Sequence, residues 1–175
     1  MTEQDKTIDA LTTALQMEID GKEFYLKASE SSQNTLGKEL LQSLAEEEDT
    51  HRRKFEEIYE AVRSRNEWPS ISYEPDGGKR LKTILATATG SMDSEVTAAT
   101  SELDAVKTAM TMENNTYDFY VARSQATAYG AERDFYRALS AQEKAHHAVL
   151  LDYYEFLQNP AAWFVQKEHP SLDGG

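Results

Sequence analysis

Two short stretches of the chain carry the same pair of metal-binding residue types at the same spacing. Glu48 and His51 form one Glu-x-x-His motif, and Glu143 and His146 form a second. Residues three apart on a helix lie on one face, so each motif would direct a carboxylate and an imidazole the same way. Oxygen and imidazole ligands suit iron or manganese ions. Both motifs are therefore candidates for metal binding.

An internal duplication shows that the two motifs are related. The second motif follows the first by 95 residues, and the same offset places Glu18 on Glu113 without a gap. The offset also separates Glu48 from its neighbour Glu47, which aligns with Gln142 rather than with a second glutamate. A repeat of this length indicates two copies of one structural unit.

Six side chains are thereby expected to converge in the interior. In both halves the same number of residues separates the first glutamate from the motif, which would put them at one height in a helical hairpin. Four ionised carboxylates repel each other in a low-dielectric core, and two divalent cations would cancel their charge. Two ferric ions with one oxide bridge carry the same total charge. The candidate metal ligands are Glu18, Glu48, His51, Glu113, Glu143 and His146.

Two tyrosines are candidates for supporting these ligands. Tyr25 and Tyr120 each follow the first glutamate of their half by about two helical turns, on the same face. Their hydroxyls could donate hydrogen bonds to the carboxylates. The alternative is that both rings are core residues whose hydroxyls are satisfied elsewhere.

Hydrophobic periodicity predicts the helices that would position these residues. The predicted long helices cover residues 7–31, 36–65, 96–128 and 131–158. Short turns join them pairwise, which is typical of antiparallel helical hairpins. Turn residues interrupt the pattern between the hairpins, where only 79–88 could form a short helix.

The sequence therefore predicts an all-α four-helix bundle made of two duplicated hairpins. We expect one domain over residues 1–175, with repeat one at 7–65, a long crossover at 66–95, repeat two at 96–158 and a short helical tail at 159–175.

Composition limits the partners and the location. The formal net charge is −13, which argues against nucleic acid and anionic membranes as partners. The chain has no cysteine, so disulfides and thiolate metal sites are excluded. No apolar run approaches the ~20 residues of a membrane span, and the polar N-terminus lacks a signal-peptide core. A cytoplasmic location is the default expectation.

These residues, in this order, resemble the rubrerythrin branch of the ferritin-like superfamily over nearly all of residues 7–158. The matching segments are Met17-Glu18, Phe24-Tyr25, Leu44-Ala45-Glu46-Glu47-Glu48 with His51, Met112-Glu113, Phe119-Tyr120, and Glu143 with His146. The resemblance implies a ferritin-like fold with the six candidate residues as ligands. It also implies two iron ions per chain with an oxide or hydroxide bridge, replaceable by manganese or zinc.

The resemblance further implies a reaction. The ferrous pair would reduce hydrogen peroxide or oxygen and be re-reduced by an external donor protein, rubredoxin-like or a flavin reductase, in oxidative-stress defence. A homodimer is expected. The alternative functions are a ferroxidase that serves iron storage or transport, and a metal-binding structural bundle without turnover.

Two departures from the family pattern bear on that reaction. Full-length rubrerythrins carry a C-terminal rubredoxin-like domain with a four-cysteine iron site, and this chain has no cysteine, so the donor is expected to be a separate protein. Rubrerythrins also carry an extra glutamate linked to peroxidase behaviour, where this chain has Thr116, and the first repeat has Gly21. The ligand set is therefore closer to the six-residue centres of bacterioferritin type.

Overall fold

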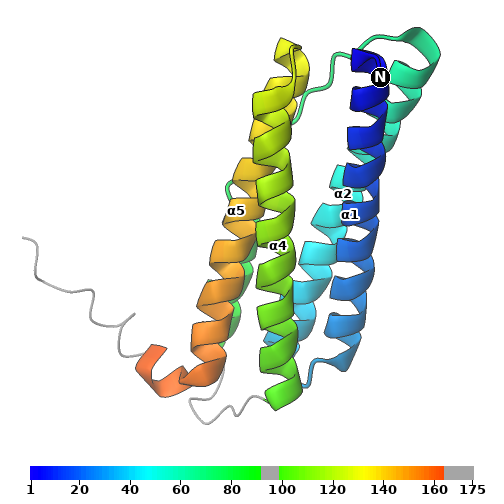
Figure 1. Ribbon diagram of the computed structural model, residues 1–175. Helices are drawn as coiled ribbons and strands as arrows, with labels where there is room; N and C mark the ends of the chain where they lie inside the picture. Colours follow the sequence, from blue (N-terminus) through cyan, green and yellow to red (C-terminus); the bar gives the residue numbers. More distant parts are fainter. Residues whose placement is uncertain (92–98, 164–175) are drawn as a thin grey trace, which may run out of the picture.

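The computed structural model describes residues 1–91 and 99–163, and all regular structure in these residues is helical (Figure 1). The helices are α1 (Glu3–Ser31), α2 (Thr35–Arg65), α3 (Lys79–Ser91), α4 (Thr100–Ala126) and α5 (Gly130–Gln158), and a further helical turn covers 160–163. Helices α1 and α2 form one hairpin, α4 and α5 form the other, and α1 also packs on α4. The predicted four-helix bundle of two hairpins is confirmed.

Local capping sets the bounds of the first hairpin. The Thr2 hydroxyl accepts a hydrogen bond from the Asp5 N–H at 3.1 Å, and the Asp5 carboxylate accepts one from the Thr2 N–H at 2.7 Å. The Asn34 side chain caps α2 by accepting from the Gly37 N–H at 2.6 Å. Helix α2 ends at Asn66, whose left-handed conformation (φ 56°, ψ 29°) stops further helical turns. The side chains of Thr2, Asp5 and Asn34 thus accept from N–H groups that have no partner within a helix.

The third long helix begins later than the sequence predicted. Its predicted start was residue 96, but Ala99 has an extended backbone (φ −66°, ψ 144°) and α4 begins at Thr100. The Ala99 side chain makes no capping hydrogen bond, so no residue type marks this start in the sequence. Residues 96–98, and the part of the predicted tail from 164 to 175, lie outside the described residues.

Residues 66–91 of the crossover run back along the bundle, towards the end where α4 begins (Figure 1). Helix α3 packs against both α2 and α5, and it buries Leu81 and Leu85. The Asp76 carboxylate caps its start by accepting from the Gly78 N–H at 2.7 Å and the Arg80 N–H at 3.1 Å. The described part of the crossover, through α3, thus lies against α2 and α5.

Two apolar clusters lie in the bundle, one towards each end. One is centred on leucines of the first half of α2 and apolar residues of the second half of α5, and includes Tyr25. The other contains Phe55, Ile58, Phe135 and Tyr120. The residues between them in α2 and α5 include the two Glu-x-x-His motifs. Apolar side chains therefore enclose these motifs from both sides, and the level of the bundle that holds the motifs is called the polar layer below.

A buried glutamate accepts a hydrogen bond from the residue that begins each hairpin turn. Ser32, which ends α1, donates to Glu102, and Thr127, which ends α4, donates to Glu132 at 2.6 Å. The two hydroxyl residues are related by the 95-residue offset, so both copies use the same turn device. Each carboxylate comes from the N-terminal part of a helix in the second repeat. At the position matching Glu132, the first repeat has Gly37.

Candidate metal centre

All six candidate ligands meet in the polar layer of the bundle. Each is at most 4% exposed, although four of them are carboxylates. Helix α1 supplies Glu18, α4 supplies Glu113, and α2 and α5 each supply one Glu-x-x-His motif. The duplication thus brings both copies of the motif into one buried centre.

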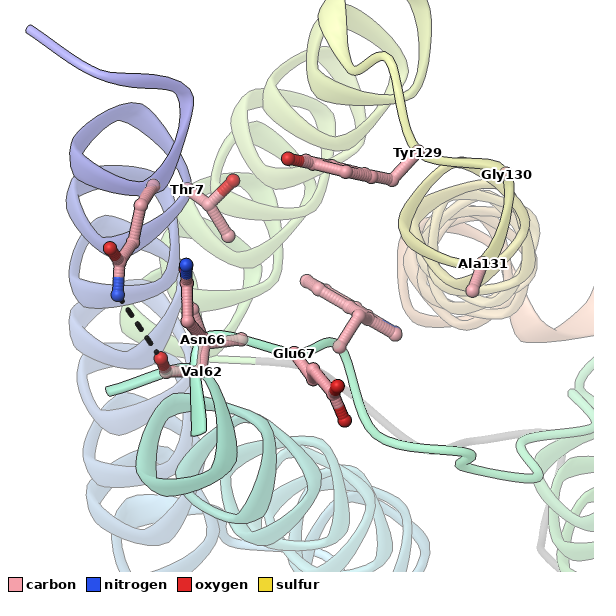
Figure 2. A pocket seen from close by; sticks show the side chains of 9 residues that line it. Thr7, Val62, Asn66, Glu67, Tyr129, Gly130 and Ala131 are labelled. Carbon is pink, nitrogen blue, oxygen red and sulfur yellow. Dashed lines mark hydrogen bonds between the residues drawn. The ribbon is translucent and has the colours of Figure 1, made fainter. Parts of the chain in front are cut away.

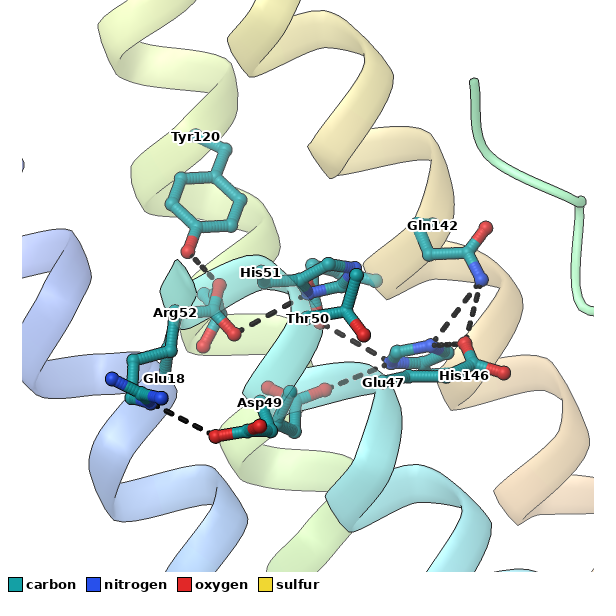
Figure 3. Close-up of polar contacts among 12 residues, drawn as sticks. Glu18, Glu47, Asp49, Thr50, His51, Arg52, Tyr120, Gln142 and His146 are labelled. Atoms are coloured by element: carbon teal, nitrogen blue, oxygen red, sulfur yellow. Dashed lines mark hydrogen bonds and ion pairs between the residues drawn. The ribbon is translucent and has the colours of Figure 1, made fainter. Parts of the chain in front are cut away.

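The two imidazoles lie among the carboxylates (Figure 3). His51 Nδ1 lies 3.3 Å from Glu18 Oε2 and 3.2 Å from Glu143 Oε1. His146 Nδ1 lies 3.2 Å from Glu48 Oε1, and 3.5 Å from one oxygen each of Glu113 and Glu143. The rings are 5.8 Å apart between centroids and nearly parallel, at 12°.

The donor atoms fall into two overlapping groups suited to a metal ion each. In each group, one atom from every residue lies within 4.8 Å of the others. One group is Glu18, Glu48, His51 and Glu143, and the other is Glu48, Glu113, Glu143 and His146. Glu48 and Glu143 belong to both, which is the arrangement expected of carboxylates that bridge two ions.

The atoms that face the centre have no hydrogen-bond partners. They are Glu18 Oε2, Glu48 Oε1, His51 Nδ1, Glu113 Oε2, both Glu143 oxygens and His146 Nδ1. Buried polar atoms are rarely left unpaired, because an unpaired group loses its hydration without compensation. Their convergence from four helices fits a pair of cations as their shared partner.

The outer nitrogens of the two imidazoles also have partners. His51 Nε2 lies 2.8 Å from the Tyr73 hydroxyl, and His146 Nε2 lies 2.7 Å from Glu47 Oε2. A carboxylate only accepts hydrogen bonds, so His146 Nε2 carries a hydrogen, and Nδ1 is the nitrogen that a cation in the centre could bind. Such partners fix the orientation of a metal-binding imidazole.

Two further residues complete this outer network. Gln142 Nε2 donates to Glu47 Oε2 at 2.8 Å and to Asp76 Oδ1 at 3.0 Å. The sequence contained one indication of Glu47 and Gln142. The two residues align at the 95-residue offset, and each directly precedes the glutamate of its motif. Tyr73 and Asp76 lie in the crossover, which has no repeat pattern to mark them.

Tyr25 and Tyr120 donate hydrogen bonds to carboxylates of the centre. Each crosses to the other hairpin: Tyr25 donates to Glu113 Oε1, and Tyr120 donates to Glu18 Oε1. Burial, together with the neighbouring carboxylates, raises the pKa of both tyrosines well above the usual value, so they remain protonated donors. The second oxygen of each glutamate stays directed at the centre.

We expect Tyr120→Phe to lower the affinity for metal by about tenfold, since hydrogen bonds to ligands commonly contribute that much. Tyr153→Phe is the matched control, because Tyr153 is also buried and donates to a glutamate, Glu102, at the end of the bundle. Competition titration with a chromophoric chelator measures both variants. Equal affinities in the two variants would contradict the assignment of Tyr120.

Without metal, the centre retains protons. Burial and the neighbouring carboxylates raise the pKa of Glu48, and the same causes raise the pKa of Glu113 to about 8. Burial lowers the pKa of His51 and His146, but the facing carboxylates outweigh it and raise both pKa values well above normal. Cations that bind here must displace these protons.

The metal-free and metal-loaded proteins should respond to pH in opposite directions. A carboxyl whose pKa is raised on folding stabilises the fold below its unfolded pKa, and this stability is lost as pH rises through the folded pKa. For Glu113 the loss extends from about pH 4.5 to about pH 8. For each proton that the folded protein holds and the unfolded chain does not, the midpoint of thermal unfolding would fall by roughly 3–5 °C per pH unit.

Metal binding should reverse the sign of this pH dependence of stability. Metal ions compete with protons for the same atoms, so they bind more tightly as pH rises. Thermal unfolding at pH 5.5, 6.5 and 7.5, with and without metal, measures both trends. Parallel curves for the two forms would show that the centre does not exchange protons for metal.

The site lacks the additional carboxylate of the family pattern. Thr116 is buried and donates to the Met112 carbonyl of its own helix at 3.0 Å. At its counterpart Gly21, an added Cβ would lie 3.1 Å from Glu48 Oε2. Both positions therefore leave the centre with four carboxylates, and Gly21 makes room for one of them.

One cavity lies elsewhere, at the end of the bundle (Figure 2). It has a volume of about 410 Å³ and contains none of the six candidate ligands. Its lining residues are Gln4, Thr7, Val62, Asn66, Glu67, Trp68, Tyr129, Gly130 and Ala131. The polar layer, rather than this cavity, holds the groups that could perform chemistry.

Four long helices around four carboxylates and two imidazoles define a carboxylate-rich metal-binding bundle of ferritin-like type. The family model for rubrerythrin matches residues 9–154, and the chain belongs to the rubrerythrin family. Comparisons with curated proteins and with solved structures gave no match. The resemblance read from the sequence is confirmed, and family and centre together fit a di-iron carboxylate protein.

In the part of the chain that the structure describes, none of the helices has the length and apolar character needed to cross a membrane.

Proposed function

We propose that the protein is a non-haem di-iron oxidoreductase. Its Fe(II) pair would be oxidised by hydrogen peroxide or oxygen and re-reduced by an external donor protein, in defence against oxidants. The observation that carries this proposal is the set of buried, unpaired donor atoms in two groups that share two carboxylates. Family membership supports redox partners and an oxidant substrate.

Each protein ligand has a distinct part in this proposal. Glu48 and Glu143 would bridge the ions, because they belong to both groups. Glu18 and Glu113 would each bind one ion with the oxygen that the tyrosine leaves free. His51 and His146 would bind through Nδ1. Four carboxylates and two divalent ions give a neutral centre, which removes the cost of buried charge.

A bound iron pair would supply two electrons, and the reduction of one peroxide to two waters would also consume two protons. The chain's own groups influence both requirements. Tyr25 and Tyr120 hold protons at the carboxylates, and Glu47 orients His146 by accepting its Nε2 hydrogen. The apolar clusters at both ends restrict water around the centre.

Anaerobic loading with Fe(II), followed by rapid mixing with peroxide or with oxygen, tests the proposed reaction. We expect two irons oxidised per peroxide, and repeated turnover when a reductant is present. Glu113→Gln should abolish this oxidation, whereas Glu102→Gln, a buried glutamate away from the centre, should retain it. Iron that binds but does not react with either oxidant would contradict the proposal.

A ferroxidase function in iron storage is the second candidate. The observation that favours it is Thr116, which leaves the centre without the extra glutamate linked to peroxidase behaviour. Storage requires a closed shell of many subunits around the mineral, whereas we expect a homodimer. The particle mass from light scattering therefore separates the two candidates.

A further inference from the structure

The two halves of the centre differ in the groups behind their imidazoles. A phenol hydroxyl, Tyr73, lies 2.8 Å from His51 Nε2, whereas a carboxylate, Glu47, lies 2.7 Å from His146 Nε2. The duplication does not repeat either partner. Glu47 aligns with Gln142, and Gln142 donates to Glu47 instead of accepting from His51 (Figure 3).

This difference changes the donor strength of the two ligands. A carboxylate that accepts the outer hydrogen of an imidazole forms a charge-assisted bond and increases the basicity of the ring. A neutral phenol does this less. His146 should therefore bind a cation more strongly than His51. The carboxylates do not cause this difference, because each group contains Glu48, Glu143 and one further glutamate.

Access to the two imidazoles also differs. A cavity of about 150 Å³ reaches His51 between α2, α5 and the crossover, and the half-buried Tyr73 forms part of its wall. The lining residues are Glu47, Thr50, His51, Tyr73, Glu74, Asp76 and Gln142. His146 is fully buried and is not among them. The cavity therefore contacts His51 itself, which is 2% exposed, whereas on the His146 side it contacts only the neighbours of that ring, Glu47 and Gln142.

We propose that the two metal positions are inequivalent: the position with Glu113 and His146, backed by Glu47, binds its ion first and tightly, and the position with Glu18 and His51, beneath Tyr73, is the exchangeable one. This inference rests on the proposed function only in requiring two metal ions in the centre. It assigns Glu47 and Tyr73 as positioning residues that make a duplicated site unequal.

Partial loading tests which position fills first. Metal-free protein is given one equivalent of Co(II), crystallised, and examined by anomalous scattering at the cobalt edge. We expect a peak at the His146 position about tenfold stronger than that at the His51 position. Equal peaks, or a stronger peak beside His51, would overturn the inference.

Calorimetric titration of variants with Co(II) tests the cause. Glu47→Gln keeps the shape and an accepting oxygen but removes the charge, and should weaken the first binding step by about 10- to 100-fold. Glu74→Gln is the matched control, because it removes the same charge from the same cavity and Glu74 contacts neither imidazole. Tyr73→Phe should leave the first step unchanged.

The outcomes separate this inference from the proposed function. Similar losses of affinity in Glu47→Gln and Glu74→Gln would overturn the inference, because the loss of any negative charge at the cavity would then explain the weaker binding. Two ions bound with no preference would overturn it while leaving the proposed function intact. Ordered filling without oxidation by peroxide or oxygen would uphold the inference and contradict the function. Failure to bind Co(II) in the centre would overturn both.

Discussion

Glu143→Gln should reduce the metal content of the loaded protein from two ions per chain to less than one. Glu143 belongs to both groups of donor atoms, and both its oxygens are buried without a hydrogen-bond partner. They lie 3.2 Å from His51 Nδ1 and 3.5 Å from His146 Nδ1. An amide of the same shape lacks the charge needed by either ion, so both positions should weaken together. Elemental analysis after anaerobic loading and desalting measures the loss.

Two other variants serve as comparisons for the metal content of Glu143→Gln. Glu18→Gln affects one group only, so about one ion per chain should remain. Glu132→Gln removes a fully buried carboxylate at the end of the bundle and should leave two ions bound. If Glu143→Gln retained both ions, Glu143 could not bridge them.

Gly37→Ala should lower the free energy of unfolding by about 2–3 kcal/mol, which corresponds to a fall of roughly 5–10 °C in the unfolding midpoint. A Cβ here would collide with the hydroxyls of Ser32 and Tyr153, and would lie 2.6 Å from Glu102 Oε1. These groups are held together by buried hydrogen bonds, so they cannot move apart without leaving a polar atom unpaired.

Gly130→Ala is the control for this substitution. Gly130 begins α5, and an added Cβ would have no neighbour within 4 Å. Alanine favours the helix over glycine, so this variant should be unchanged or slightly stabilised. Thermal unfolding of the metal-free proteins compares the two directly. An unchanged midpoint in Gly37→Ala would mean that the turn does not need this close contact.

The duplication explains why the bundle and the six central residues could be predicted from the sequence. One glutamate or one Glu-x-x-His motif is common on solvent-facing helix surfaces. Their repetition at one offset, inside apolar stripes, placed Glu18 beside Glu113 and His51 beside His146. The same offset relates Tyr25 to Tyr120, but the sequence left open whether their hydroxyls meet the carboxylates or other groups, and the structure shows that each donates to the opposite hairpin.

The features that the sequence did not predict are those that break the repeat. Tyr73 and Asp76 approach the centre from the crossover, where neither periodicity nor duplication applies. Glu47 has no glutamate counterpart, because Gln142 stands at the matching position, and this mismatch underlies the proposed difference between the two metal positions. The start of α4 after Ala99 was missed because no side chain caps it.

The most direct test of the central claim is an anomalous difference map at the iron edge, from crystals of the anaerobically iron-loaded protein. The account predicts two iron peaks enclosed by Glu18, Glu48, His51, Glu113, Glu143 and His146. A map with iron only at surface carboxylates, or with no peak in the polar layer, would contradict it.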